Sequence, residues 1–267
     1  MIKAIVSGVA GRMGGRIVHM MEGVEGITLA GALERPDHPA VGKDVGEVVG
    51  LPPKGIAVAG SLDEVLPQGE VLIEFTSPEP SFAHFMKAVA AGKAMVIGTT
   101  GFSQAQLAEI KELAPKTRVV LAPNMSVGVN LMFKVVEDIA RVLPEGYDVE
   151  IIEAHHRLKK DAPSGTALKL AQVIAQAMNR DLEHVGVYGR KGLVGERTKE
   201  EIGVQTVRAG DIVGEHTVIF GGIGERLEII HRAHSRDNFA RGAVRAALWV
   251  TKQRPGFYDM QDVLGLK

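Results

Sequence analysis

The sequence predicts an α/β protein in two parts, a parallel sheet domain wound by helices and a second α+β domain with a mixed sheet. Up to residue 124, short apolar runs alternate with helical patterns, which is typical of a parallel sheet covered on both faces. A glycine-rich turn follows the first apolar run directly, as in nucleotide-binding sheets. Beyond residue 200, three strand-like runs follow one another without an intervening helix, which indicates a separate sheet.

The expected elements of the first part alternate regularly along the chain. Each expected strand is a short run of mostly apolar, often β-branched residues. Ser103, followed three residues later by Gln106, forms a capping-box pattern that marks a helix start. The strands are expected at Lys3–Ser7, Ile27–Leu33, Val71–Phe75, Met95–Ile97 and Val119–Leu121, and the helices at Arg12–Met21, Pro80–Ala91 and Gln104–Ala114.

After residue 124 the pattern changes. A long helix capped by Ser126 is expected to run to about Val142, whereas the polar segment Arg180–Lys199 has no clear period and predicts a long loop. Gly221–Gly224 predicts a hairpin turn. The other strands are expected at Asp148–His155, Val204–Ala209, His216–Phe220 and Leu227–His231, and the helices at Ala167–Met178 and Phe239–Lys252. The last helix is expected to pack back on the first domain, so the predicted domains are 1–126, 127–235 and a returning segment, 236–267.

Composition excludes several classes of protein. The 267 residues are 45% hydrophobic and 24% charged, which suffices for a buried core. A net charge of −1 leaves no basic footprint for nucleic acid or an anionic membrane, and an aromatic content of 4% disfavours base stacking. Without cysteine there is no disulfide, thiolate metal site or cysteine nucleophile. No signal peptide and no apolar run near the ~18 residues of a membrane span is evident, so we expect a cytoplasmic protein.

The first expected strand runs into Gly8, Gly11 and Gly14, spaced G-x-x-G-x-x-G. Glycine permits turn conformations that a Cβ would forbid, and it lets the backbone approach a pyrophosphate closely. The helix that follows would direct its unpaired N–H groups at the phosphates. The spacing differs from the commoner G-x-G-x-x-G, so by itself it fits a dinucleotide site and an ordinary tight turn equally well.

The end of the second expected strand favours the dinucleotide interpretation. Glu34 lies at about the ~20-residue offset of the acid that accepts the ribose hydroxyls of NAD. Arg35, directly beside it, suits the 2′-phosphate of NADP. The alternative is a solvated surface pair, and the sequence does not rank NADH against NADPH.

Two later loops, Gly98–Gly101 and Ala122–Met125, each follow a predicted parallel strand. Ligands of open α/β sheets bind beyond the carboxyl ends of the strands. Small and hydroxyl residues leave room there for a nicotinamide, although each loop alone could be an ordinary connection. Together with the glycine turn, the loops predict a Rossmann-type domain with a nicotinamide site.

The segment from Glu153 to Thr166 concentrates two histidines, an arginine and two lysines between a predicted strand and a predicted helix. Adjacent His155 and His156 would point to opposite faces of a strand, and no third ligand cluster is evident, so we expect no metal site. Ser164-Gly165-Thr166 opens a helix whose N–H groups and hydroxyls can hold a carboxylate. Lys159 would add positive charge, and His155 can exchange a proton near neutral pH. A basic solvated loop with a structural histidine is the alternative.

This segment closely resembles the signature of the dihydrodipicolinate reductase family, also called 4-hydroxy-tetrahydrodipicolinate reductases. The resemblance covers nearly the whole chain and includes the blocks Gly11–Gly14, Val96–Phe102, Asn124–Asn130 and Arg208–His216 in order. It implies an NADH- or NADPH-dependent enzyme of lysine and diaminopimelate biosynthesis that reduces a cyclic dicarboxylate to tetrahydrodipicolinate. It also implies a Rossmann domain, a mixed-sheet substrate domain and a homotetramer.

By motif match, the resemblance assigns roles to individual residues. His155 corresponds to the family's proton donor or acceptor and Lys159 to its proton donor. The substrate carboxylates are expected at His156, Ser164, Gly165 and Thr166. The cofactor is expected at Gly8, Val9, Ala10, Gly11, Arg12, Met13, Glu34, Arg35, Gly98, Thr99, Thr100, Ala122, Pro123, Asn124 and Met125. Because substrate and cofactor would belong to separate domains, we expect the domains to close when both ligands bind.

Two other functions fit parts of the sequence. Another Rossmann reductase of amino-acid metabolism, such as an aspartate or homoserine dehydrogenase, would carry different residues after the change of pattern. A non-catalytic NAD(H) sensor would leave the histidine–lysine segment unexplained. Oxidation of the reduced cofactor in the presence of fresh synthase product distinguishes the enzyme from the sensor.

Overall fold

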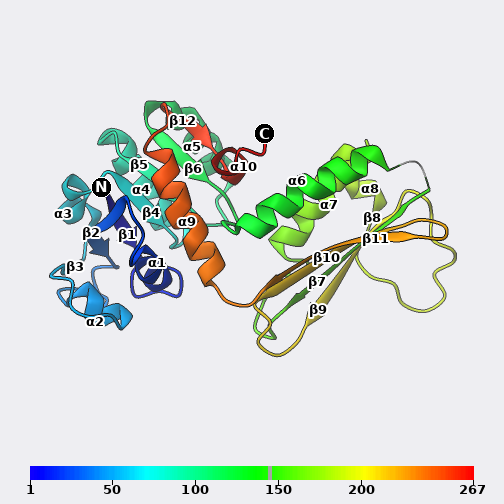
Figure 1. Cartoon of the computed structure of the whole chain (residues 1–267), viewed down its shortest axis with the longest axis horizontal. Helices are drawn as coiled ribbons and strands as arrows, with labels where there is room; N and C mark the ends of the chain where they lie inside the picture. Colours follow the sequence, from blue (N-terminus) through cyan, green and yellow to red (C-terminus); the bar gives the residue numbers. More distant parts are fainter. Residues whose placement is uncertain (144–145) are drawn as a thin grey trace. The chain divides into compact units, whose positions relative to one another are not determined.

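The computed structural model describes residues 1–143 and 146–267 (Figure 1). The described chain divides into two compact units. The first combines Met1–Val127 with Arg236–Lys267, and the second is Gly128–Ser235. In the described ranges, no helix is both long and apolar enough to cross a bilayer.

The first unit is built on a seven-stranded sheet of order β12-β6-β5-β4-β1-β2-β3. All of its recorded strand pairings are parallel. The parallel sheet predicted from alternating strands and helices is therefore confirmed. Its strands are β1 (Ile2–Ser7), β2 (Ile27–Leu33), β3 (Val58–Ala59), β4 (Val71–Glu74), β5 (Ala94–Ile97), β6 (Arg118–Leu121) and β12 (Gly256–Tyr258).

Helices cover both faces of this sheet. Successive residues of each strand point to opposite sides, so a strand made of apolar residues has an apolar face on each side that must be buried. In β1, Ala4 and Val6 join one apolar cluster, and Ile5 between them joins the other. The predicted capping box between Ser103 and Gln106 is confirmed at the start of α5. The helices are α1 (Gly14–Met21), α2 (Val45–Val49), α3 (Leu62–Val65), α4 (Pro78–Ala90), α5 (Gln104–Leu113), α9 (Asp237–Val250) and α10 (Met260–Leu264), with short 3₁₀ turns at Leu66–Gln68 and Ala114–Lys116.

Helix α9 belongs to the first compact unit, with the rest of the segment Arg236–Lys267. Its buried alanines belong to the same apolar cluster as the inner residues of α1 and β1. Arg16 of α1 and Asp237 of α9 form an ion pair with 2.7 Å between Nε and Oδ1. The segment after residue 235 is therefore an integral part of the first unit.

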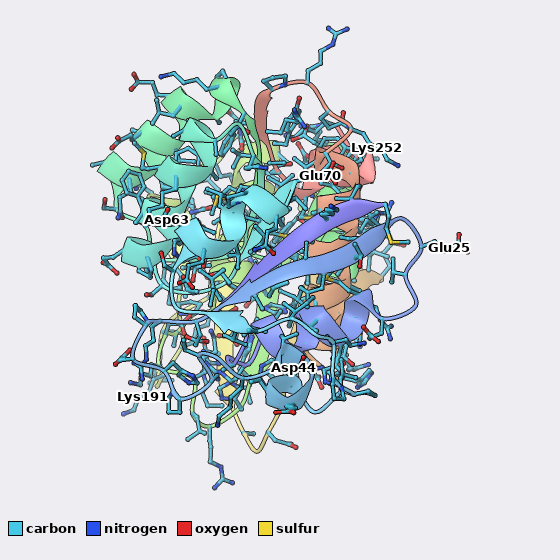
Figure 2. The ribbon with its side chains drawn as sticks, turned by 90° about the vertical axis from the view of Figure 1, so that its left-hand side faces the viewer. Glu25, Asp44, Asp63, Glu70, Lys191 and Lys252 are labelled. Carbon is cyan, nitrogen blue, oxygen red and sulfur yellow. The ribbon has the colours of Figure 1, made fainter. Side chains whose placement is uncertain are left out.

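The loop between β2 and β3 is held together by one carboxylate. Asp44, labelled in Figure 2, accepts a hydrogen bond from Gly46 N–H at the start of α2, 2.8 Å away. It also accepts from Lys54 N–H at 2.9 Å and Gly55 N–H at 2.7 Å. These backbone bonds to the charged form lower the pKa of Asp44. The loop that follows Glu34 therefore has a defined shape.

The second unit contains a five-stranded mixed sheet of order β11-β10-β7-β9-β8, as the successive strand-like runs predict. Central strand β7 pairs parallel with β9 and antiparallel with β10. Helices α6 and α7 cover one face of the sheet (Figure 1). The elements are α6 (Val127–Val142), β7 (Asp148–His155), α7 (Gly165–Ala177), α8 (Leu182–Val185), β8 (Gly186–Val187), β9 (Ile202–Arg208), β10 (Gly214–Gly221) and β11 (Arg226–Ala233).

The prediction of a structureless loop over Arg180–Lys199 is wrong for its first residues, which form α8 and β8. Asp181 caps α8 by accepting a hydrogen bond from Glu183 N–H at 3.0 Å. The two elements span only four and two residues, about one period each, so no repeating hydrophobic pattern can reveal them in the sequence.

Candidate active site

The glycine turn of the first unit is shaped by close backbone approaches. Gly8 has a positive φ of 66°, a conformation that favours glycine. A Cβ on Gly14 would lie only 2.2 Å from the carbonyl oxygen of Gly8. The side chain of Val9 is fully buried, so only its backbone can face a ligand. Arg12 is exposed, Met13 is half-buried and helix α1 starts directly after them. The turn therefore presents mainly backbone, as a pyrophosphate site requires.

The side chain of Glu34 contacts the backbone of this turn. Its carboxylate accepts hydrogen bonds from Ala10 N–H at 3.2 Å and from Arg35 N–H at 3.1 Å. Arg35 is exposed and pairs with Asp37 at 3.3 Å. Next to Ala10 lies a hollow of about 410 Å³ whose lining includes His38 and Lys43. The predicted ribose-binding acid and the glycine turn are thus brought together, beside basic side chains.

The loops after β5 and β6 lie side by side because these strands are neighbours in the sheet. A Cβ on Gly98 would lie 2.1 Å from the ring of Phe75, so this position requires glycine. The hydroxyl of Thr99 is buried and has no hydrogen-bond partner in the described chain. Thr100 and Pro123 are exposed, and Ala122 and Met125 are buried. Asn124 Oδ1 accepts a hydrogen bond from Ser126 N–H at 2.9 Å. A glycine turn that presents mainly backbone and an unpaired hydroxyl at the same sheet edge fit a dinucleotide.

In the second unit, His155 lies at the end of β7 and is held by a buried carboxylate. Its Nδ1 lies 2.6 Å from Oε2 of Glu153, which is fully buried. Arg208 of β9 binds both oxygens of Glu153 at 2.8 Å. The register of β7 with β9 places Arg208 opposite His155, which explains how residues far apart in sequence meet.

The combined effect of burial and the neighbouring charges of this cluster lowers the pKa values of both Glu153 and His155. Burial alone would raise the pKa of Glu153, but Arg208, His155 and the Ser164 N–H outweigh it and lower that pKa to about 2. Burial lowers the pKa of His155, and Lys159 and Arg208 lower it further against the opposing effect of Glu153. At neutral pH, Glu153 is therefore a carboxylate and His155 is neutral.

Ser164 is the N-cap of α7, and its polar groups are bonded within the unit. Its N–H donates to Glu153 at 2.9 Å, and its hydroxyl accepts from Ala167 N–H at 3.2 Å. The same hydroxyl lies 3.1 Å from Nε2 of His216, whose ring meets His155 edge-on. Burial lowers the pKa of His216 to about 3, so it is neutral as well. The cap is thus rigidly attached to the His155 cluster.

The other predicted residues of this segment differ in their surroundings. The backbone of Gly165 faces open space, with no atom within 4 Å of where a Cβ would lie. Thr166 follows it in the first turn of α7. Lys159 pairs with Asp161 at 2.9 Å, and Nδ1 of half-buried His156 has no partner among the described residues. The segment therefore combines a helix N-terminus, a lysine and the unpaired Nδ1 of His156, a set of groups that can bind an anion.

The sequence motifs indicate no role for Glu153, Arg208 or His216, although these residues lie within the segments that carry the family resemblance. The sequence offers one indication for Glu153. It stands two residues before His155 in a predicted strand, and this spacing places the two side chains on the same face. Arg208 and His216 are brought to the site by strand pairing, which no local pattern reveals.

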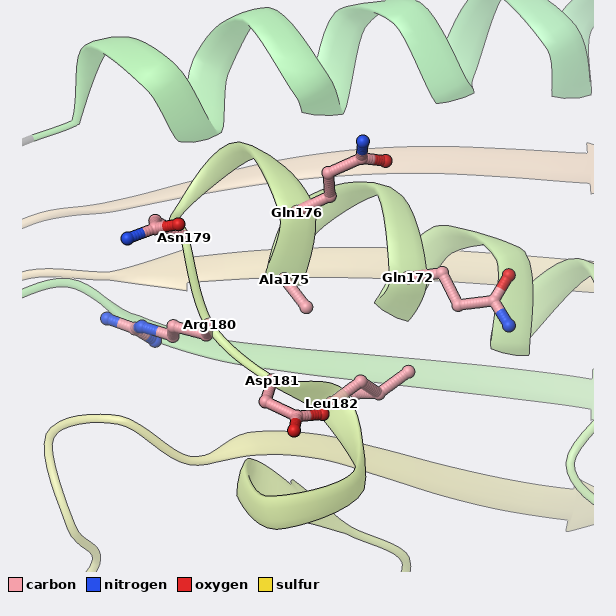
Figure 3. Close-up of a pocket in the computed structure, with 7 residues that line it drawn as sticks. All are labelled: Gln172, Ala175, Gln176, Asn179, Arg180, Asp181 and Leu182. Carbon is pink, nitrogen blue, oxygen red and sulfur yellow. The ribbon is translucent and has the colours of Figure 1, made fainter.

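Another hollow in the second unit lies away from this cluster. It has a volume of about 470 Å³ and is lined by residues at the C-terminal end of α7, among them Gln176, Asn179 and Arg180 (Figure 3). Its first lining residue, Gln172, lies eight residues after Ser164, which is roughly 12 Å along the helix. It holds no histidine or lysine, so it does not compete as the acid–base site. Within the described ranges, no cluster of three or more histidine and acidic side chains is arranged to hold a metal ion.

Two family models match this chain. The model described as dihydrodipicolinate reductase, N-terminus, matches residues 2–125, and the model described as dihydrodipicolinate reductase, C-terminus, matches residues 128–264. The chain belongs to the dihydrodipicolinate reductase family. The resemblance seen in the sequence is thereby confirmed.

Curated relatives and solved structures agree with this membership. The chain is 58% identical to the 4-hydroxy-tetrahydrodipicolinate reductase of Syntrophus aciditrophicus and 59% identical to that of Syntrophobacter fumaroxidans, with 100% of each chain covered. It is 29% identical to the dipicolinate-bound dihydrodipicolinate reductase from Paenisporosarcina sp. TG-14, with a TM-score of 0.78, 98% of this chain and 99% of that one covered. An amine dehydrogenase from Mycobacterium smegmatis, at 15% identity, TM-score 0.61 and coverage of 96% and 94%, shares the fold alone.

Proposed function

We propose that this chain reduces 4-hydroxy-tetrahydrodipicolinate, by way of its dehydrated form, to tetrahydrodipicolinate with NADH or NADPH, a step of lysine and diaminopimelate biosynthesis. One observation carries the proposal beyond family membership. Neutral His155, anchored on Glu153, and Lys159 belong to the same unit as the N-terminus of α7, where Gly165 leaves the backbone open. An acid–base pair and an anion cradle are the two functions that this reaction requires.

The cofactor is assigned to the first unit, and when bound it supplies the hydride. The glycine turn and the N-terminus of α1 would hold its pyrophosphate, and Glu34 its ribose. The unpaired hydroxyl of Thr99 would bond to its nicotinamide end. The residues proposed to contact the cofactor are Gly8, Val9, Ala10, Gly11, Arg12, Met13, Glu34, Arg35, Gly98, Thr99, Thr100, Ala122, Pro123, Asn124 and Met125.

The substrate, a small dicarboxylate, is assigned to the second unit. The first backbone N–H groups of α7, at Gly165 and Thr166, would donate to a carboxylate, and His156 would add a further donor. Ser164 would contribute as the cap that orients these groups, because its own N–H is committed to Glu153. Fixing two carboxylates would present one face of the ring to the hydride, which is a positioning effect.

Lys159 and His155 would manage charge and protons. Hydride arriving at the far end of the conjugated ring pushes electron density towards the imine nitrogen. The Lys159 ammonium would stabilise that density and donate the proton that completes the reduction. His155, neutral and with Nδ1 engaged, would exchange protons through Nε2. Hydride transfer needs direct contact between the reacting carbons, so we expect domain closure when both ligands bind.

The test of this function is a continuous assay with the purified chain. Nicotinamide absorbance is followed after addition of freshly formed synthase product, with either reduced cofactor. We expect oxidation that depends on both the product and the chain. Binding of the reduced cofactor without any oxidation would instead favour the sensor interpretation.

Cofactor preference provides a separate prediction. Arg35 and Lys43 are exposed cations near Glu34 and Ala10, where an added ribose phosphate would lie. Replacing either by alanine should raise KM for NADPH by about fivefold, the equivalent of ~1 kcal/mol for an exposed ion pair. KM for NADH and kcat should stay unchanged. The charge-matched control is Lys87→Ala. It removes a lysine of α4 whose Nζ lies 2.6 Å from Oδ2 of Asp63. Equal effects on both cofactors would contradict the assignment.

The uncovered face of the second sheet supports a homotetramer. Ile152, Val207 and Ile230 point away from α6 and α7, and their exposed fractions are 37%, 43% and 44%. Apolar residues gathered on one sheet face are typical of an interface between copies. We therefore expect a tetrameric mass in light scattering and a smaller mass for Ile152→Glu. A monomeric wild-type chain would refute this prediction.

A further inference from the structure

We propose that Glu153 and Arg208 form a positioning pair that holds His155, the cap of α7 and the Lys159 loop in one fixed arrangement. The inference rests on the proposed function, because it concerns how the same site is kept ready for reaction. Neither residue is expected to touch the substrate. Their effect is exerted through the groups that do.

The acceptor capacity of Glu153 is fully used. One oxygen lies 2.6 Å from His155 Nδ1 and 2.8 Å from Arg208 Nη1. The other accepts from Arg208 Nη2 at 2.8 Å, Ser164 N–H at 2.9 Å and the Thr206 hydroxyl at 3.3 Å. A carboxylate offers about four acceptor positions. Glu153 therefore cannot shift towards one partner without weakening its bonds to the others.

Arg208 extends this arrangement to the lysine loop. Its Nη2 also donates to the backbone carbonyl of Asp161 at 2.7 Å. The side chain of Asp161 in turn pairs with Lys159 Nζ at 2.9 Å. The proposed proton donor is thus linked to Glu153 through one arginine and one short loop.

The geometry also fixes the tautomer of His155. An ionised carboxylate can only accept hydrogen bonds, so Nδ1 must carry a hydrogen and Nε2 must carry the lone pair when the ring is neutral. Gly214 of β10 lies against this side of the ring, since its Cβ would be 3.0 Å from Nε2. The nitrogen left to exchange protons is therefore Nε2.

Stability alone is a weak reason to bury such a pair. Removing an ion pair from water costs free energy that the attraction between the charges barely recovers, and apolar residues of similar volume often serve as well. Glu150, on the same strand, shows the contrast: it pairs with Arg190 and Arg197 but remains partly exposed and contacts neither His155 nor Ser164. Burial of Glu153 beside the site points to a positional role.

The decisive experiment compares Glu153→Gln with Glu150→Gln. Both exchanges remove a carboxylate charge from β7 and disturb an arginine pair, but only the first releases His155. We expect Glu153→Gln to lower kcat by roughly 10–100-fold, by analogy with the loss of a partner that orients a metal-binding histidine, with KM for the cofactor unchanged. Glu150→Gln should keep wild-type kcat. Unfolding curves of both variants show whether the fold survives.

The pH profile separates positioning from a purely structural effect. The groups that face His155 are Glu153, Lys159, Arg208 and His216, and among them only Glu153 raises the pKa of His155. Removing its charge should lower that pKa, so the limb of the rate profile governed by His155 should move to lower pH. Equal kcat and an unmoved profile in a folded Glu153→Gln variant would overturn the proposal.

The wild-type chain gives a test that needs neither a variant nor turnover. Imidazole ¹⁵N shifts of His155 at neutral pH should report hydrogen on Nδ1 and a lone pair on Nε2. The opposite tautomer would refute the positioning pair even if the enzyme is active. Conversely, the expected tautomer in a chain that oxidises no cofactor would leave the pair intact and refute the proposed function.

Discussion

Replacing Lys159 or His155 by alanine is expected to lower kcat by roughly 10²–10⁴, the range for the loss of a positioned acid–base group. In the proposed reaction, Lys159 Nζ would supply a positive charge and a proton. His155 would contribute through Nε2, because its Nδ1 is bonded to Glu153. Single-turnover and steady-state rates with either reduced cofactor measure the effect.

This prediction is specific because kcat should fall while the affinity for the cofactor should not change. Both residues belong to the second unit, whereas the glycine turn and Glu34 belong to the first. Binding of the reduced cofactor, followed by its fluorescence, should therefore match the wild type. Lys160→Ala, which removes the neighbouring exposed lysine, is the control and should keep near-normal turnover. Wild-type turnover in both the Lys159 and the His155 variants would remove these residues from the reaction.

Much of the fold follows from local sequence patterns. The strands of the first unit are apolar runs with few polar interruptions, because each is buried on both faces by helices. The start of α5 is fixed by the reciprocal bonds of Ser103 and Gln106, a signal that lies within four residues. By contrast, β3 and β12 span only two and three residues, too few for any period. Their place in the sheet depends on neighbouring strands.

The candidate site also contains both residues that local sequence predicts and residues that it does not. His155, Lys159 and Ser164 lie within ten residues of one another, so the sequence predicts that they act together. Arg208, which we propose to order them through Glu153, is brought in by the parallel pairing of β7 with β9. A motif can therefore indicate the groups that react, but the network that orients them depends on strand register.

Replacing Gly14 by alanine should distort the glycine turn more than the small size of the added methyl group suggests. The added Cβ would lie 2.2 Å from the carbonyl oxygen of Gly8 and 2.8 Å from Cα of Val9, and both are backbone atoms that cannot rotate away. The turn or the start of α1 must shift. We expect unfolding free energy to fall by about 1–3 kcal/mol, the range for overpacking, and KM for both cofactors to rise at least about tenfold.

The neighbouring glycine provides the matched control for this prediction. A Cβ on Gly15 would meet its nearest atom, the carbonyl oxygen of Val9, at 3.4 Å, which is ordinary contact. Gly15→Ala should therefore keep cofactor KM and raise stability by roughly 0.5–1 kcal/mol, because alanine in a helix loses less backbone entropy than glycine. Urea unfolding and cofactor titration of the two variants give the comparison. Both exchanges add one methyl group to the same helix, so a difference between them is expected to come from the close approach of Gly14 to the backbone of Gly8 and Val9. Equal cofactor binding by the two variants would show that this approach does not shape the site.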